Sequence, residues 1–269
     1  MRGRNRITQM AAVGLLVSVT PADPSWAQNE PISGEQLAAA AEQVRSFVPT
    51  DRFDEPPAGP AWNGLRFIYT VEPVSWGADG YPCAGLATWD YRDGQLSVSA
   101  RPEFINPFTF PGQSRGAGSS HHGRPIVDLN LYSITCRQSP IEEIQATNAF
   151  GAQFPVRRWT DSAIGIFDSG DFDPAWKAYW HTELDGVAAR EVTRNLRVRV
   201  SGKLSAWPNG RMIMCGTDES VPTVTKPTDR TRKICGFNGR PDHIEFLNAA
   251  TGQVLYEVAR RPVSAANSR

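Results

Sequence analysis

The stretch Leu196-Arg-Val-Arg-Val-Ser-Gly-Lys-Leu-Ser-Ala-Trp207 alternates apolar and polar side chains from Leu196 to Ala206. Successive side chains of a β-strand point to opposite faces, so this pattern predicts a strand with one buried and one solvated face. Asn209-Gly210 then predicts a turn that brings Ile213 and Cys215 to the apolar side. The chain is therefore expected to contain sheets with one face on a core.

A second stretch, Leu86–Ala100, predicts a β-hairpin around the two-residue turn Asp93-Gly94. In that register Tyr91 faces Leu96 and Trp89 faces Val98, which places four large side chains on one face. Local turn chemistry and the apolar pattern agree here.

Further strands are expected from shorter apolar patterns, and the last two are expected to form a closing hairpin across Ala249-Ala-Thr-Gly252. A change of parity within Ile126–Cys136 predicts a bulge. These strands favour a mainly β fold, an antiparallel β-sandwich or a partly open barrel. The segments concerned are Leu65–Val71, Ile126–Cys136, Glu143–Asn148, Gln153–Thr160, Ala163–Phe167, Ile244–Leu247 and Val254–Val258.

Two helices are expected beside the sheets. Ser33-Gly-Glu-Gln36 matches a capping box, and apolar residues at helical spacing follow it up to Pro49. This helix is interpreted as a cover on the β core, because an exposed apolar stripe is unfavourable. A short internal helix is expected at Pro174–Trp180, with Asp173 as its N-cap.

Residues 1–27 are expected to be a secretory signal peptide. Arg2, Arg4 and Arg6 precede an apolar stretch, and Ser25-Trp26-Ala27 fits a cleavage site. The apolar stretch is shorter than the roughly 20 residues of a transmembrane helix, so no membrane-spanning segment is expected after cleavage. The expected location is the periplasm or the extracellular space.

The remaining chain is expected to contain an N-terminal helix with a Pro-rich connector (28–60), an antiparallel β domain (61–260) and a disordered tail (261–269). Removing residues 1–27 takes away three Arg and one Asp, so Lys plus Arg falls from 28 to 25 and Asp plus Glu from 28 to 27. The resulting net charge of −2 argues against nucleic acid as a partner. No sequence feature implies a cofactor.

Four cysteines are expected to form structural disulfides in an oxidising compartment. Of the three possible pairings, Cys83–Cys136 with Cys215–Cys235 is favoured, because each pair brackets a loop-rich stretch. Gly216–Lys233 is then a closed polar loop, either a partner contact or a protected insertion. No spacing suits a zinc site.

The longest stretch without strand character, Arg101–Arg124, is a candidate site because long loops in compact domains are often functional. His121 or His122 with Ser120 or a nearby acid would make a hydrolase, and the phenylalanines would line its wall. A flexible loop with incidental histidines is the alternative. The phenylalanines concerned are Phe104, Phe108 and Phe110.

Charged and aromatic residues elsewhere supply weaker candidates. Asp168, Asp171 and Asp173 lack the order of a calcium loop, and turn formation or helix capping accounts for them. The row Arg197, Arg199 and Lys203 is either an anion-binding surface or a solvated strand face balanced by acids on its neighbours.

Trp207 is expected to be the most exposed tryptophan and a binding residue, because it lies on the polar side of its strand. Tryptophan rings hold sugars in some proteins and fill β cores in others.

The sequence therefore predicts an exported bacterial envelope protein that acts as a non-catalytic binding or interaction module through its long loops. The expected partners are an envelope protein, a glycan or a small apolar ligand. The alternative is the exported hydrolase with His121 or His122.

Overall fold

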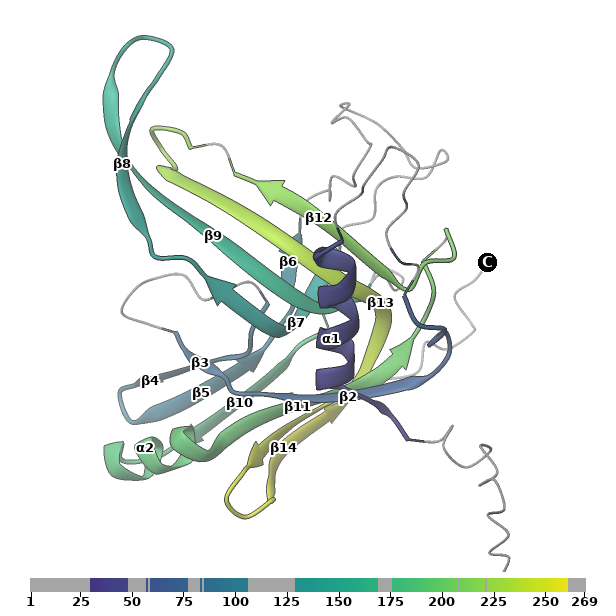
Figure 1. Cartoon of the computed structure of the whole chain (residues 1–269). Helices are drawn as coiled ribbons and strands as arrows, with labels where there is room; N and C mark the ends of the chain where they lie inside the picture. The colour runs from purple at the N-terminus through teal and green to yellow at the C-terminus, as the bar shows by residue number, and fades with distance from the viewer. Residues whose placement is uncertain are drawn as a thin grey trace, which may run out of the picture. The chain divides into compact units, whose positions relative to one another are not determined.

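The computed structural model describes residues 30–47, 57, 59–76, 83, 85–105, 129–168, 176–207, 209–220 and 222–260 (Figure 1). The described residues from Pro31 onward belong to one compact unit. The expected signal peptide and C-terminal tail lie outside the described residues, as does most of the Pro-rich connector.

A large sheet contains ten of the described strands. Its order is β1-β2-β11-β13-β9-β7-β6, with β12 and β14 also on β13 and β8 on β9. Their bounds are β1 Ile32–Ser33, β2 Arg66–Val71, β6 Glu103–Ile105, β7 Leu129–Gln138, β8 Glu142–Thr147, β9 Gln153–Asp168, β11 Leu196–Leu204, β12 Ile213–Glu219, β13 Thr228–Asn248 and β14 Val254–Ala259.

Strands β9 and β13 form the centre of this sheet. They pair in parallel from Arg157↔Thr228 to Asp168↔Gly239. Their outer edges each take two shorter antiparallel partners, β8 and β7 on β9 and β12 and β11 on β13. The mainly β prediction is confirmed, but the large sheet is mixed and not purely antiparallel. The sequence did not predict the parallel pair, because parallel strands are not joined by a short turn that a sequence pattern could reveal.

A smaller sheet contains β10 (Ala178–Glu183), β5 (Gln95–Ala100), β4 (Thr88–Arg92) and β3 (Val74–Ser75), in that order. The predicted hairpin is confirmed: Tyr91 pairs with Leu96 and Trp89 with Val98. Asp93 and Gly94 both have positive φ, +51° and +79°, as a two-residue hairpin turn requires.

The two sheets share one core. Buried side chains on β11 follow the predicted alternation, with Val198 and Val200 inward and Arg197 and Arg199 less buried. Leu96 on the small sheet belongs to the same apolar cluster. The largest fully buried members of this cluster are Phe67, Phe237 and Phe246. The two-sheet arrangement predicted from the strand pattern is thus observed.

Helix α1 (Gly34–Arg45) covers part of the same core. The predicted capping box is present, since Ser33 and Gln36 exchange side-chain and backbone hydrogen bonds. Leu37 and Ala41 are fully buried in the core cluster. The covering role predicted for this helix is therefore confirmed.

The short internal helix lies elsewhere than predicted. Helix α2 spans Gly186–Asn195, capped by Asp185, whereas Ala178–Trp180 belongs to strand β10. Burial alternates along Trp176 to Glu183, and β10 pairs with β5. Trp176 and Trp180 lie four residues apart and both contact the core, which a strand achieves as well as a helix.

Both predicted disulfides are confirmed, and the described residues contain no free cysteine. Cys215 and Cys235 are directly opposite each other in the β12–β13 ladder, with Cα atoms 4.0 Å apart. This bond closes Gly216–Lys233 as predicted, but most of the segment is not loop, because it continues these two strands. Two such bonds are typical of an oxidising compartment.

Two further sequence predictions are confirmed in the large sheet. The ladder between β7 and β9 shifts register between Ser133 and Thr135, which is the predicted bulge. Strands β13 and β14 form the predicted closing hairpin, with Gly252 at a φ of +72° in its turn.

Candidate functional site

The β8–β9 hairpin, residues 142–158, extends beyond the ends of the neighbouring strands (Figure 1). Its outer part, residues 144–156, contains no Asp, Glu, Lys or Arg, and we call it the uncharged end. Glu142 and Glu143 lie opposite Arg158 and Arg157 at the base of this end. Charge is thus confined to the base of the hairpin.

The turn at the tip is fixed by its own hydrogen bonds. Asn148 Oδ1 accepts from the backbone N–H groups of Phe150 and Ala152, at 3.0 and 2.9 Å. The backbone of Asn148 also bonds to Ala152 and Gly151, and Gly151 has a φ of +84°. Phe150 is held outward and is 95% exposed. An aromatic side chain so exposed on an ordered turn is a candidate contact residue.

A second hairpin, β12–β13, ends beside the base of the first. The Arg157 N–H donates to the Pro227 carbonyl at 3.1 Å, and Arg158 forms an ion pair with Asp229 at 2.7 Å. Val224, in the turn of this second hairpin, is 62% exposed. Backbone and side-chain contacts therefore join the bases of the two hairpins.

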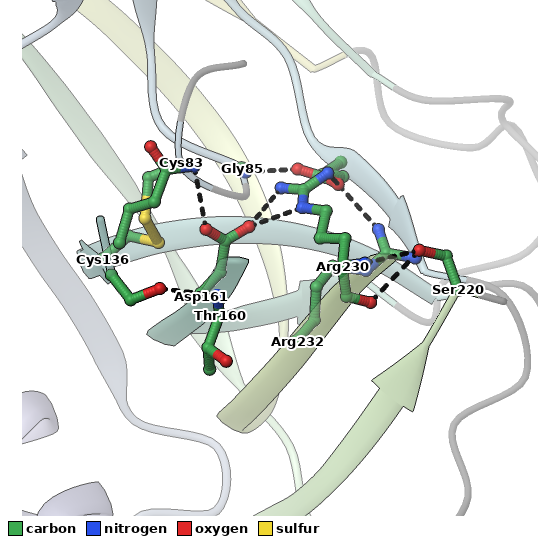
Figure 2. A network of polar contacts seen from close by, with 11 residues as sticks. Cys83, Gly85, Cys136, Thr160, Asp161, Ser220, Arg230 and Arg232 are labelled. Atoms are coloured by element: carbon green, nitrogen blue, oxygen red, sulfur yellow. Dashed lines mark hydrogen bonds and ion pairs between the residues drawn. A yellow bond between two sulfur atoms is a disulfide. The ribbon is translucent and has the colours of Figure 1, made fainter. Parts of the chain in front are cut away.

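A network of buried charges lies where the two hairpins join the sheet (Figure 2). Asp161 on β9 is fully buried and accepts from Arg230 Nε at 2.6 Å. Glu103 Oε1 on β6 accepts from both Arg230 and Arg232, at 2.9 and 2.7 Å. Gln138 on β7 donates to the second oxygen of Asp161 at 3.1 Å. We call Glu103, Asp161, Arg230 and Arg232 the arginine–carboxylate cluster.

Two serines and a loop extend this network. Ser139 Oγ accepts from the Thr160 N–H and Ser220 Oγ from the Arg230 N–H, at 2.9 and 2.8 Å. The Gly85 N–H, two residues after Cys83, donates to Glu103 at 3.1 Å. The carboxylates are occupied by guanidinium groups, so the cluster holds the hairpin bases in place rather than offering an acid or a base to a substrate.

Most residues of the predicted hydrolase site lie outside the described residues. These are Phe108, Phe110, Ser120, His121 and His122. Phe104 lies on β6, with its backbone opposite Asn130. The hydrolase alternative therefore stays a prediction.

Arg197 and Arg199 lie on the outer face of β11 and each has an acidic partner. Arg199 donates two hydrogen bonds to Glu245, at 2.6 and 2.7 Å, and Arg197 forms an ion pair with Glu72 at 3.3 Å. The hydrogen bond from Arg199 lowers the pKa of Glu245 below its usual value. This matches the interpretation of a strand face balanced by neighbouring acids.

Trp207 is buried, so the prediction that it is exposed is wrong. It is 8% exposed and packs edge-on against Phe167, at 5.7 Å between ring centroids. With Leu131, Ala163 and Ile234 it forms a second apolar cluster. The strand ends at Leu204, so its alternation no longer determines where the Trp207 ring points.

Other candidate sites have little support among the described residues. Asp168 forms a buried ion pair with Arg260 at 2.7 Å. The described residues contain no group of three side chains that could bind a metal ion. No described helix is both long and apolar enough to cross a membrane.

A cavity of about 10 Å³ lies between the sheets beside Tyr69 and Tyr132. It has room for about one water molecule and not for an apolar ligand.

Sequence reasoning predicted strands on both sides of Phe150 but did not single out the tip. Two signals were available: the uncharged run 144–156, and Asn148 placed three residues before Gly151. No sequence signal joins Glu103 or Asp161 to Arg230, because these residues meet only through the parallel pairing of β9 with β13 and the position of β6.

No protein-family model, curated protein or solved structure matches this chain.

Proposed function

We propose that this chain is an exported, non-catalytic interaction module of the bacterial envelope, and that it binds a partner protein through the β8–β9 hairpin. One observation carries the proposal: Phe150 is 95% exposed at the tip of a hydrogen-bonded turn. The partner has an apolar pocket that receives this ring.

The geometry suits an anchor residue. Burying a phenylalanine side chain contributes about 1.5–3 kcal/mol, and aromatic anchors in pockets dominate many interfaces. The turn around Phe150 is ordered before binding, so little conformational entropy is lost when the contact forms. The uncharged end places no ionic group near the tip that a partner would have to desolvate.

A lipid surface is a less favourable partner for the same hairpin. A single phenylalanine gives too little apolar burial for stable membrane adsorption. Binding to anionic lipids also uses Lys and Arg beside the inserted group, and residues 144–156 contain neither. A protein pocket adds shape complementarity that lipid does not offer.

The test places a photoreactive benzoylphenylalanine at position 150 of the full-length protein in its own cells. The matched control carries the same group at Ala250, in the exposed β13–β14 turn. We expect one discrete protein adduct from position 150 and none from position 250. That protein, purified, should bind the unmodified chain at least about tenfold more tightly than the Phe150→Ser variant.

Three outcomes contradict the proposal: no protein adduct at position 150, adducts to lipid only, or equal affinity of the two chains for the captured protein. The Phe150→Ser change is at an exposed position, so the fold should tolerate it. Unchanged urea unfolding of the variant would establish that a loss of binding is local.

A further inference from the structure

Two exposed cations lie at the same end of the small sheet, one directly after β5 and one directly before β10. Ala100 on β5 pairs with Ala178 on β10, and both are buried. The ladder ends at this pair; Arg101 follows Ala100 directly, and Lys177 directly precedes Ala178. Unlike the two alanines, Arg101 and Lys177 are both exposed. We call them the cation pair.

Like charges opposite each other in a sheet repel and are destabilising. Within the described ranges neither residue forms an ion pair with a carboxylate, and each lies over an aromatic ring instead. Arg101 Cζ is 5.0 Å from the ring centroid of Trp76, and Lys177 Nζ is 5.3 Å from that of Tyr179. The rings hold the two cations without neutralising them.

Two acids lie on the strands of this sheet, Asp90 on β4 and Glu183 at the far end of β10, opposite Gln95. Asp90 on β4 forms an ion pair with Arg92 at 2.8 Å. Among the described residues, no carboxylate therefore neutralises the cation pair.

Hydroxyl groups continue the same face. Ser97 and Ser99 lie on β5 opposite His181 and Tyr179. Ser97 Oγ is 2.9 Å from His181 Nδ1, whereas Ser99 Oγ is buried and has no hydrogen-bond partner in the described structure. A buried hydroxyl without a partner is uncommon in folded proteins.

Two aromatic rings border this surface. Trp76 follows β3 at one edge of the sheet and Tyr179 is on β10 at the other, and each is 38% exposed. Rings offer an apolar face to the C–H groups of a sugar, hydroxyls bond to its hydroxyls, and a cation pair binds its carboxylate. Along β10 the side chains of Tyr179 and His181 are exposed to such a ligand, whereas Thr88 and the Ser99 hydroxyl are buried.

We infer that the outward face of the small sheet binds an acidic polysaccharide. The carboxylate of one uronic acid residue lies between Arg101 and Lys177, and neighbouring sugar rings pack beside Trp76 and Tyr179. This site is on the other sheet from the β8–β9 hairpin and does not depend on the protein partner proposed there.

The test measures binding of oligogalacturonate to the full chain by titration calorimetry, with an uncharged galactan oligomer of equal length as the comparison. We expect at least about a tenfold preference for the acidic oligomer. The double variant Arg101→Gln, Lys177→Gln should lose at least about tenfold in affinity. Trp76→Ala should weaken binding of both oligomers.

A matched control separates a site from general charge. Arg66→Gln with Lys203→Gln removes the same two charges from exposed positions on the large sheet. It should leave the affinity for oligogalacturonate within about twofold. If the double variant fails to fold, Lys177→Gln alone should still lower the affinity severalfold.

Four results would overturn the inference. They are no binding of oligogalacturonate, an equal loss in the control variant, no preference over the uncharged oligomer, and equal competition by inorganic phosphate at the same anion concentration. The last result would identify a site for small anions rather than for an acidic sugar chain.

Discussion

Two pairs of cations differ in their neighbours: one pair on the large sheet is bound to carboxylates, and one pair at the small sheet lies over aromatic rings. In the arginine–carboxylate cluster of the large sheet, Arg230 and Arg232 are 17% and 16% exposed and share Glu103, and Arg230 also binds the fully buried Asp161. On the small sheet, Arg101 and Lys177 lie over aromatic rings, and no carboxylate of the described residues pairs with them.

The difference separates charges that hold the fold together from charges that are available to a ligand. A buried charge is tolerated only with a close partner of opposite sign, because its desolvation costs several kcal/mol. An exposed cation remains hydrated and needs no partner. We therefore expect loss of one charge to reduce stability at the cluster and to affect binding, but not stability, at the cation pair.

The largest effect is expected for Asp161→Ala. This change leaves Arg230 in a mostly buried position without its main partner, which should lower the free energy of unfolding by about 3–5 kcal/mol. Urea unfolding measured at neutral pH tests it, with the slope against urea required to stay unchanged.

The matched double variant is Asp161→Leu with Arg230→Met. Replacing a buried ion pair by apolar residues of similar volume is often close to neutral, so the pair should cost less than Asp161→Ala alone. Glu103 would keep its hydrogen bond from Arg232. A single variant that unfolds at the same urea concentration as the unmodified chain would show that Asp161 contributes little.

Much of the fold could be predicted from local patterns, because these patterns report which face of a strand is buried. The Asp93-Gly94 turn, the alternation from Leu196 and the capping box at Ser33 all specify structure within a few residues. The Cys215–Cys235 disulfide also joins two strands that are near in sequence, whereas Cys83 and Cys136 are 53 residues apart. The parallel pairing of β9 with β13 has no local signal, and it is this pairing that assembles the cluster.

The sites were harder to predict than the fold for a related reason. The sequence predicts a helix at Pro174–Trp180, whereas Ala178–Trp180 belongs to β10, which pairs with β5. Extending the alternation of β11 past Leu204 predicts an exposed Trp207, which is buried. The first error comes from a pairing between segments that are far apart in the sequence, and the second from the end of a strand.

An intermediate effect is expected for the Arg199–Glu245 pair, where the carboxylate is 12% exposed and the guanidinium 35%. The hydrogen bond from Arg199 lowers the pKa of Glu245 in the folded state. A lowered pKa stabilises the fold above the unfolded-state value of about 4.3, and this contribution is lost as pH falls through the folded-state value. Glu245→Gln should therefore cost about 1 kcal/mol at pH 7.

Thermal unfolding at a series of pH values measures this pair. The difference between Glu245→Gln and the unmodified chain should shrink below about pH 4.3 as Glu245 itself becomes protonated. Glu142→Gln, at an exposed position on β8, is the control and should show little difference at any pH. A Glu245→Gln difference that is independent of pH would contradict the assignment of the stability to the ionised carboxylate.

The smallest change in the free energy of unfolding is expected for the cation pair, and its sign is opposite to that of the two changes above. Without a ligand, Arg101→Gln with Lys177→Gln removes the repulsion between two like charges, so stability should stay the same or rise by about 0.5 kcal/mol. Part of this gain is offset because the contacts with Trp76 and Tyr179 are also lost. Any gain should be largest at low ionic strength and absent at 1 M salt, where screening acts over only about 3 Å. A loss of more than about 1 kcal/mol would mean that these cations hold the small sheet together, as the cluster does in the large one, and the contrast between the two regions would then be one of degree.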